Sequence, residues 1–181
     1  MIVTQDEARA LRLQKLRNHG SQPKYFHSII GGNFRLDAIQ AAVVHTKFRY
    51  LNSWTEKRQA HARDYTEAFR SAKLEAVEGF QLPSSGSGRH VFNQYVIRTP
   101  RRDVLKQFLK DRNIETEIYY PLPFHLQECF QSLGYQKGNF PESEKAAETS
   151  LALPVYPELS DKQKHWVIQS VCDFFHHRTK E

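Results

Sequence analysis

The sequence predicts a mixed α/β protein in which a small α+β lobe is joined by a long helix to the remnant of a larger domain. Two observations lead to this expectation. Apolar residues recur at helical spacing from about residue 36 to residue 69. From residue 76 onward, alternating stretches typical of strands are interspersed with helical patterns. We therefore expect residues 1–75 to hold the large-domain remnant with the long helix, and residues 76–181 to form the small domain.

The first element expected is a helix over residues 6–17. Thr4 is a candidate N-cap, because Glu7 follows it at the spacing of a capping box. Residues 18–35 are rich in Gly, Ser, Asn and Pro and show no clean period, so they are predicted to form a loop. A loop of this length in a compact protein usually has a function.

The helical pattern after this loop is longer than a typical globular helix. It predicts either one very long helix or two abutting helices, with a bend at Asn52-Ser53. The elements expected in the lobe are a strand over 90–98, a helix over 102–112, a strand over 114–118, a short helix over 142–150, and a last helix from Asp161 with Ser160 and Gln163 as its capping box.

Composition excludes several classes of protein. The net charge of +6 suits an anionic ligand, but Lys and Arg are scattered rather than gathered in a dense run, so a nucleic-acid module ranks last. Two cysteines without metal-ligand spacing indicate neither a metal site nor a disulfide framework. The absence of an apolar span or a leader pattern predicts a cytoplasmic protein that does not enter a membrane.

The loop contains a candidate site for phosphate. Asn33 and Arg35 follow a glycine pair just before a helix is expected near Leu36, and an amide and a guanidinium both suit phosphate oxygens. The local pattern leaves other roles open: Asn33 as a cap or turn residue, and Arg35 in an ion pair with Asp37. Likewise, Tyr119, Tyr120 and His125 can each be core or hydrogen-bonded structural residues.

Several motifs occur in a characteristic order along the chain. They are His19-Gly20, Gly31-Gly32-Asn33-Phe34-Arg35-Leu36-Asp37 with Gln40-Ala41-Ala42, Arg102-Asp103, Tyr120-Pro121-Leu122-Pro123-Phe124-His125-Leu126-Gln127, Phe140-Pro141, and Leu151-Ala152-Leu153-Pro154-Val155-Tyr156-Pro157. With these motifs the chain resembles, over essentially its whole length, the DegT/DnrJ/EryC1/StrS family of sugar aminotransferases.

The resemblance implies the C-terminal part of a fold type I transferase that uses pyridoxal phosphate. The lysine that binds this cofactor would lie upstream, since none of the lysines here has the matching context. No catalytic residue is therefore assigned to this chain, and it is expected to be inactive alone. The implied reaction moves an amino group from glutamate to a nucleotide-linked keto-sugar, for cell-surface polysaccharides such as lipopolysaccharide or for deoxyamino sugars.

The resemblance also implies roles for individual residues. In a homodimer, Asn33 would reach the cofactor phosphate of the partner subunit, and Arg35 would help to hold anions of the cofactor or of the sugar nucleotide. Tyr119, Tyr120 and His125 would lie near the sugar or the nucleotide, and His27 is a further substrate-side candidate. The alternative is a non-catalytic, truncated relative that dimerises through the long helix and acts as a regulator.

Overall fold

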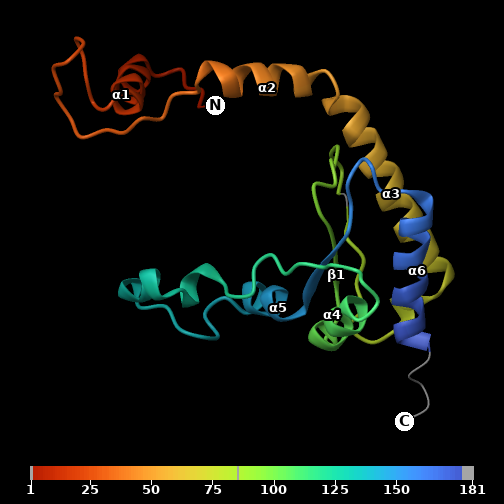
Figure 1. Ribbon diagram of the computed structural model, residues 1–181. Helices are drawn as coiled ribbons and strands as arrows, with labels where there is room; N and C mark the ends of the chain where they lie inside the picture. Colours follow the sequence, from red (N-terminus) through yellow and green to blue (C-terminus); the bar gives the residue numbers. More distant parts are fainter. Residues whose placement is uncertain (1, 85, 177–181) are drawn as a thin grey trace. The chain divides into compact units, whose positions relative to one another are not determined.

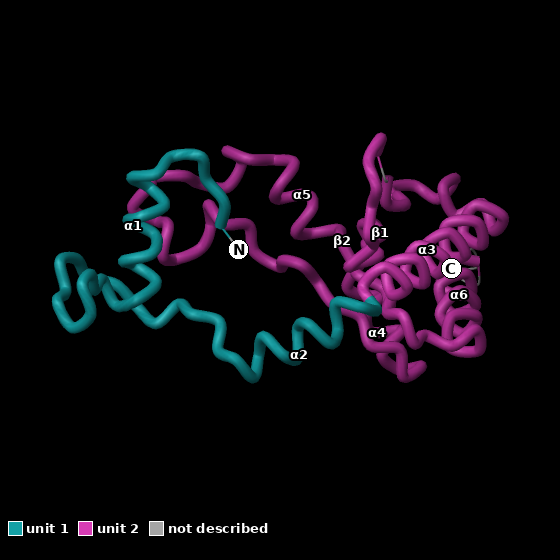
Figure 2. The backbone as a smooth tube through the Cα atoms, turned by 90° about the horizontal axis from the view of Figure 1, so that it is seen from above, with its two compact units in different colours: residues 1–50 teal, residues 51–181 magenta. Residues whose placement is uncertain are grey.

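A computed structural model describes residues 2–84 and 86–176. The chain forms two compact units, residues 1–50 and residues 51–181 (Figure 2). The boundary between them falls inside the predicted long helix. The predicted domains, residues 1–75 and 76–181, are defined differently from these compact units, and their boundary stays a prediction.

The first unit holds helices α1 (Glu7–Arg17) and α2 (Ala38–Phe48). The prediction that Thr4 caps α1 was wrong. The carboxylate of Asp6 accepts the Arg9 N–H at 3.0 Å, so Asp6 is the N-cap. Thr4 lies further out and accepts the N–H of Asp6. Both residue types favour caps, so the local sequence did not distinguish them.

The predicted loop is tied to the end of α1 by backbone hydrogen bonds. The N–H of Gly32 donates to the carbonyl of Leu16 at 3.0 Å, and that of Phe34 donates to Arg17 at 3.1 Å. Gly20 is buried with φ +74°, and a Cβ there would lie 1.7 Å from the carbonyl oxygen of Ile29. Only glycine fits this position, so the loop has a defined path.

The long helical pattern corresponds to two helices, as one of the two expectations stated. α2 ends at Phe48 and α3 (Leu51–Ser71) begins three residues later. The break therefore falls at Arg49-Tyr50, before the predicted bend at Asn52-Ser53. The Tyr50 N–H donates to the Lys47 carbonyl at 3.0 Å, an i→i−3 bond that tightens the last turn.

The second unit contains a two-stranded antiparallel sheet of β1 (Tyr95–Arg98) and β2 (Ser150–Leu153), with Tyr95 opposite Leu153. The predicted strand over 90–98 is shorter than expected, because Phe92 adopts a left-handed φ of 46° and donates its N–H to the His90 ring. This geometry is incompatible with an extended strand.

The predicted strand over 114–118 forms only one bridge, between Glu117 and Ala152. The true partner of β1 is β2, which the sequence pattern did not predict. All four residues of β2 are buried, so the strand lacks the alternation that marks a half-exposed strand.

The predicted helices of the second unit are confirmed. They are α4 (Arg102–Lys110), α5 (Pro141–Thr149) and α6 (Asp161–His176). The unit also contains short 3₁₀ turns, η1 (Leu74–Ala76), η2 (Phe124–Leu126) and η3 (Glu128–Leu133). The capping box of α6 is present: Ser160 Oγ accepts the Gln163 N–H at 3.3 Å, and Gln163 Oε1 accepts the Ser160 N–H at 3.0 Å.

The core of this unit lies between the sheet and helices α3, α4 and α6, and α3 and α6 run side by side (Figure 1). Its fully buried members include Tyr65 and Phe69 of α3, Ile97 of β1, Leu105 of α4 and Val171 of α6. Burial of these side chains is the main stabilising contribution to the unit.

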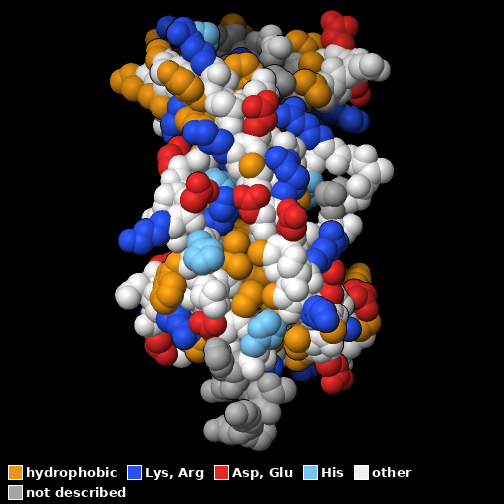
Figure 3. Space-filling model, turned by 90° about the vertical axis from the view of Figure 1, so that its right-hand side faces the viewer, with side chains coloured by type: hydrophobic (Ala, Val, Ile, Leu, Met, Phe, Trp, Pro, Cys, Tyr) orange, Lys and Arg blue, Asp and Glu red, His pale blue; other side chains and the backbone are white. Residues whose placement is uncertain are grey.

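Two general features concern possible partners. Within residues 2–84 and 86–176, no helix is long and apolar enough to cross a membrane, and no cluster of His, Cys, Asp and Glu could hold a metal ion. On the face seen in Figure 3, Lys and Arg side chains are interspersed with Asp and Glu rather than gathered into a basic surface.

His61 of α3 is a buried titratable group outside the predicted site. The residue is 9% exposed, and neither ring nitrogen has a hydrogen-bond partner among the described residues. Burial lowers the pKa of His61, and the ammonium of Lys164 lowers it further, while Asp64, Asp161 and the Pro157 carbonyl act in the opposite direction. The folded protein therefore favours the neutral ring.

We expect the second unit to lose stability as the pH falls below about 6.5, the ordinary histidine pKa. Below that value the unfolded chain binds a proton that His61 in the folded chain resists, so protons favour unfolding. Urea denaturation on either side of this pH measures the effect. A His61→Leu variant, which cannot titrate, should lose less stability on acidification, and an equal loss in both proteins would contradict the assignment.

Candidate functional site

Asn33 and Arg35 lie together at the end of the loop, just before α2. The Nε of Arg35 donates to the Asn33 side-chain oxygen at 2.9 Å, and both side chains are exposed. Asp37 caps α2 by accepting the Gln40 N–H at 2.9 Å. Asn33 is therefore not the cap of α2; it lies in an isolated bridge with Asn18. Arg35 contacts Asn33 rather than Asp37.

This arrangement suits an oxyanion. The hydrogen bond from Nε to Asn33 fixes the plane of the guanidinium, while the two Nη groups and the Asn33 amide nitrogen have no partner among the described residues. A guanidinium held in one orientation binds a phosphate with two parallel hydrogen bonds.

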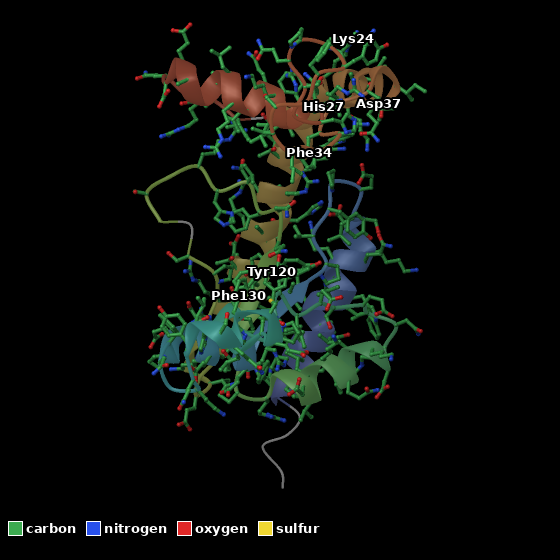
Figure 4. The ribbon with its side chains drawn as sticks, turned by 90° about the vertical axis from the view of Figure 1, so that its left-hand side faces the viewer. Lys24, His27, Phe34, Asp37, Tyr120 and Phe130 are labelled. Atoms are coloured by element: carbon green, nitrogen blue, oxygen red, sulfur yellow. The ribbon has the colours of Figure 1, made fainter. Side chains whose placement is uncertain are left out.

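His27 belongs to the same loop, and Figure 4 labels it together with Phe34 and Asp37. Its Nδ1 lies 2.8 Å from the carbonyl oxygen of His19, which holds the ring in place. The surrounding loop is unusually apolar for a surface: Ile30 is 97% exposed and Phe34 is 73% exposed. Exposed apolar side chains of this size mark an interaction surface or a ligand site.

Tyr119 and Tyr120 are exposed in the second unit, on the segment between α4 and η2. Their rings meet edge to face at 6.0 Å, and Tyr120 is labelled in Figure 4. An aromatic pair with hydroxyl groups offers both a stacking face and hydrogen bonds to a ligand. The alternative of a core position does not apply, because Tyr120 is 68% exposed.

His125 is instead buried, in η2, and its Nε2 lies 2.9 Å from the Oε1 of Glu144. The ring also packs edge-on against Phe140 at 4.9 Å. Its Nε2 is therefore not available to a ligand. Of the residues predicted on the substrate side, His125 is the one that the structure places inside the fold.

Glu144, in the first turn of α5, gathers several hydrogen bonds. Besides His125, it accepts the N–H of Gly138 at 2.8 Å and that of Phe140 at 3.3 Å. Burial opposes ionisation of this carboxyl, but the hydrogen bonds from Gly138, His125 and Phe140 outweigh it and hold the pKa of Glu144 below its usual value. Glu144 thus fixes His125 and the loop before α5 as a single structure.

The role of Glu144 was not predicted from the sequence. An acidic residue in the first turn of a helix has an ordinary explanation, since it favours the positive end of the helix dipole. Its partner His125 is 19 residues away, with no periodic pattern between them. Only the fold brings the two together.

The residues of this chain fit the phosphate end of pyridoxal phosphate, and Lys164 does not fit its aldehyde end. The exposed Asn33–Arg35 pair fits the phosphate group. The lysine that binds the aldehyde needs to be available as a free amine. The surroundings of Lys164 favour the charged ammonium instead: the hydrogen bond to Asp64 and the proximity of Asp161 outweigh burial and raise the pKa of Lys164.

Comparison with known proteins identifies the class. The fold is that of fold type I aminotransferases, which confirms the predicted fold class. The crystal structure of DesV from S. venezuelae, in complex with a ketimine intermediate, matches 96% of this chain and 46% of its own with a TM-score of 0.85 at 35% identity. The chain belongs to the DegT/DnrJ/EryC1/StrS aminotransferase family, whose sequence model matches residues 1–172.

Two relatives show what the family contains. A "pleiotropic regulatory protein" of Geobacillus stearothermophilus is 47% identical over 98% of this chain and 47% of its own length. A dTDP-3-amino-3,4,6-trideoxy-α-D-glucose transaminase of Streptomyces venezuelae is 37% identical over 96% of this chain and 45% of its own. The chain thus spans about half the length of these relatives.

Proposed function

We propose that this chain is the C-terminal portion of a pyridoxal-phosphate-dependent aminotransferase that transfers an amino group from glutamate to a nucleotide-linked keto-sugar. Family membership and the transaminase among its relatives support the reaction class. The observation in the structure that carries the proposal is the exposed Asn33–Arg35 pair, held at 2.9 Å in a loop fixed to α1.

In this proposal Arg35 binds phosphate oxygens of the cofactor held by the partner subunit of a homodimer, and Asn33 orients the guanidinium. When bound, the cofactor supplies an electron sink for the carbon that loses or gains the amino group. In this proposal, the lysine that carries the cofactor lies in the part of the full-length polypeptide that this chain does not span. The role of Arg35 is electrostatic: it binds and orients an anion.

The substrate side is formed by residues with different tasks. Tyr119 and Tyr120 contact the sugar or the nucleotide through their exposed rings and hydroxyl groups. His27 offers its Nε2, since Nδ1 is held by the His19 carbonyl. His125 acts as a positioning residue: with Glu144, it fixes the segment that follows the two tyrosines.

Replacing Arg35 with alanine should weaken cofactor retention about tenfold or more, because a charge-assisted hydrogen bond is lost. The experiment uses the full-length polypeptide that carries this sequence, and measures pyridoxal phosphate affinity by absorbance and amino transfer from glutamate to a dTDP- or UDP-linked keto-sugar. Arg35→Lys should recover only part of the affinity, since lysine lacks the planar fork.

The matched control is Arg49→Ala, an exposed arginine between α2 and α3, which should leave both quantities unchanged. Wild-type cofactor affinity in the Arg35→Ala protein would contradict the assignment.

A second candidate function is that of a non-catalytic regulator, which the name of the Geobacillus relative favours. The same assay separates the two. Amino transfer by the full-length polypeptide supports the enzyme. A dimer that shows no transfer with either nucleotide sugar, and no affinity for the cofactor, supports the regulator.

A further inference from the structure

A hollow of about 420 Å³ lies in the second unit beside the first two turns of α3. One wall comes from α3 and the other from the segment 89–93 that leads into β1. The lining residues are Leu51, Asn52, Trp54, Thr55, Arg58, Arg89, Val91 and Asn93. None of them belongs to the groups assigned above.

The hollow carries uncompensated positive charge. Neither Arg58 nor Arg89 forms an ion pair with any described residue, and no carboxylate is among the described residues that line it. A larger hollow of about 720 Å³ on the same helix differs in this respect, because there Arg70 pairs with Glu75 at 3.3 Å and Glu67 also lines the wall. Charge therefore distinguishes the smaller hollow as a site for an anion.

The segment that carries Arg89 is held against α3. The side chain of Gln59 donates to the carbonyl of His90 at 2.8 Å, and the His90 ring accepts the N–H of Phe92 at 2.9 Å. Phe92 in turn packs against the core, 6.3 Å from the ring of Tyr95. Because both walls are fixed, a ligand would bind without first ordering the segment.

We propose that this hollow binds a nucleotide. Arg58 and Arg89 take the phosphate oxygens, and the base stacks against the indole of Trp54, which lines the hollow. The amides of Asn52 and Asn93 supply donors and acceptors for the edges of the base. A volume of about 420 Å³ lies within the range of small-molecule sites.

Calorimetric titration of the purified chain with dTDP, UDP, pyrophosphate and thymidine tests the proposal. Both nucleoside diphosphates should bind, and Arg58→Ala or Arg89→Ala should weaken them about tenfold or more. Trp54→Ala should weaken dTDP while leaving pyrophosphate unchanged, since only the nucleotide has a base to stack. Near-ultraviolet circular dichroism verifies the fold of each variant, and Arg58→Lys, which keeps the charge, should give a smaller loss.

Two controls separate this site from others. Arg63→Ala removes an exposed charge from the same helix outside this hollow and should have no effect. Arg35→Ala should also have no effect, so the site can be present whether or not the proposed function is correct. Absence of nucleotide binding, or binding that persists unchanged in folded Arg58→Ala and Arg89→Ala proteins, would overturn the proposal. Equal affinity for pyrophosphate and dTDP would overturn the nucleotide assignment.

Discussion

Replacement of Glu144 with alanine is expected to release the segment between Tyr119 and Phe140 from the rest of the second unit. The variant leaves the buried His125 ring and the part-buried backbone N–H groups of Gly138 and Phe140 without their acceptor. The loss of the buried bond is the most costly, and all three bonds are lost at once because they share one carboxylate. Hydrogen exchange of the amides in this segment should become roughly ten to a hundred times faster.

Glu144→Gln is the second variant to measure, because it keeps one acceptor oxygen while removing the charge. The segment should retain part of its protection from hydrogen exchange in this variant. In the full-length polypeptide, both variants should raise KM for the nucleotide sugar with less effect on cofactor affinity, because they disturb the segment of Tyr119 and Tyr120 but not Arg35. A protein whose exchange pattern is unchanged in the alanine variant would contradict the role of Glu144.

The same carboxylate gives the segment a pH dependence. The folded-state pKa of Glu144 lies below the ordinary value of 4.5, so its contribution is fully present above that pH and is lost as the pH falls through the folded value. The protection factors of these amides, each taken relative to the intrinsic exchange rate at the same pH, should therefore fall on acidification in the wild-type protein, and much less in Glu144→Gln.

Truncation of Phe69 to alanine should cost about 3–5 kcal/mol of unfolding free energy, the usual range for a buried aromatic side chain. Phe69 has no exposed surface, stacks on Tyr65 with ring centroids 5.9 Å apart, and meets Phe80 edge-on at 6.3 Å. Its removal leaves a cavity between α3 and the sheet side of the core. Urea denaturation followed by circular dichroism measures the loss.

Phe124→Ala is the matched control, since Phe124 is 72% exposed. It should change stability little, because an exposed ring buries little apolar surface on folding. If the two variants had equal stability, Phe69 would not lie in the core as described.

The helices were predictable because their signals are local. Ser160 and Gln163 indicate the start of α6 within four residues, and the structure shows both hydrogen bonds of the capping box. The strands were less predictable, since β2 is buried on both faces and immediately follows α5. The alternation over 114–118 describes one edge contact, not a strand, because pairing depends on residues far away in the sequence.

The residues of the candidate site likewise divide into those with a local sequence signal and those that only the fold brings together. Asn33 and Arg35 are two residues apart, so their type and spacing allowed an anion site to be predicted, and that site stays a prediction. His125 and Glu144 are 19 residues apart. Arg58 and Arg89 line one hollow although they are far apart in the sequence, and the hydrogen bond from Gln59 to His90, 31 residues away, helps to hold their segments together. Groups of this kind follow from the path of the chain, and no local pattern contains them.

The small sheet has a consequence for how the protein behaves when concentrated. Both strands are only four residues long, and each outer edge carries a bridge, Gln81 to Arg98 on one side and Glu117 to Ala152 on the other. Among the described residues, the sheet therefore presents no long run of unpaired backbone groups. Since such a run is the template on which fibrils grow, this sheet is protected from edge-to-edge polymerisation.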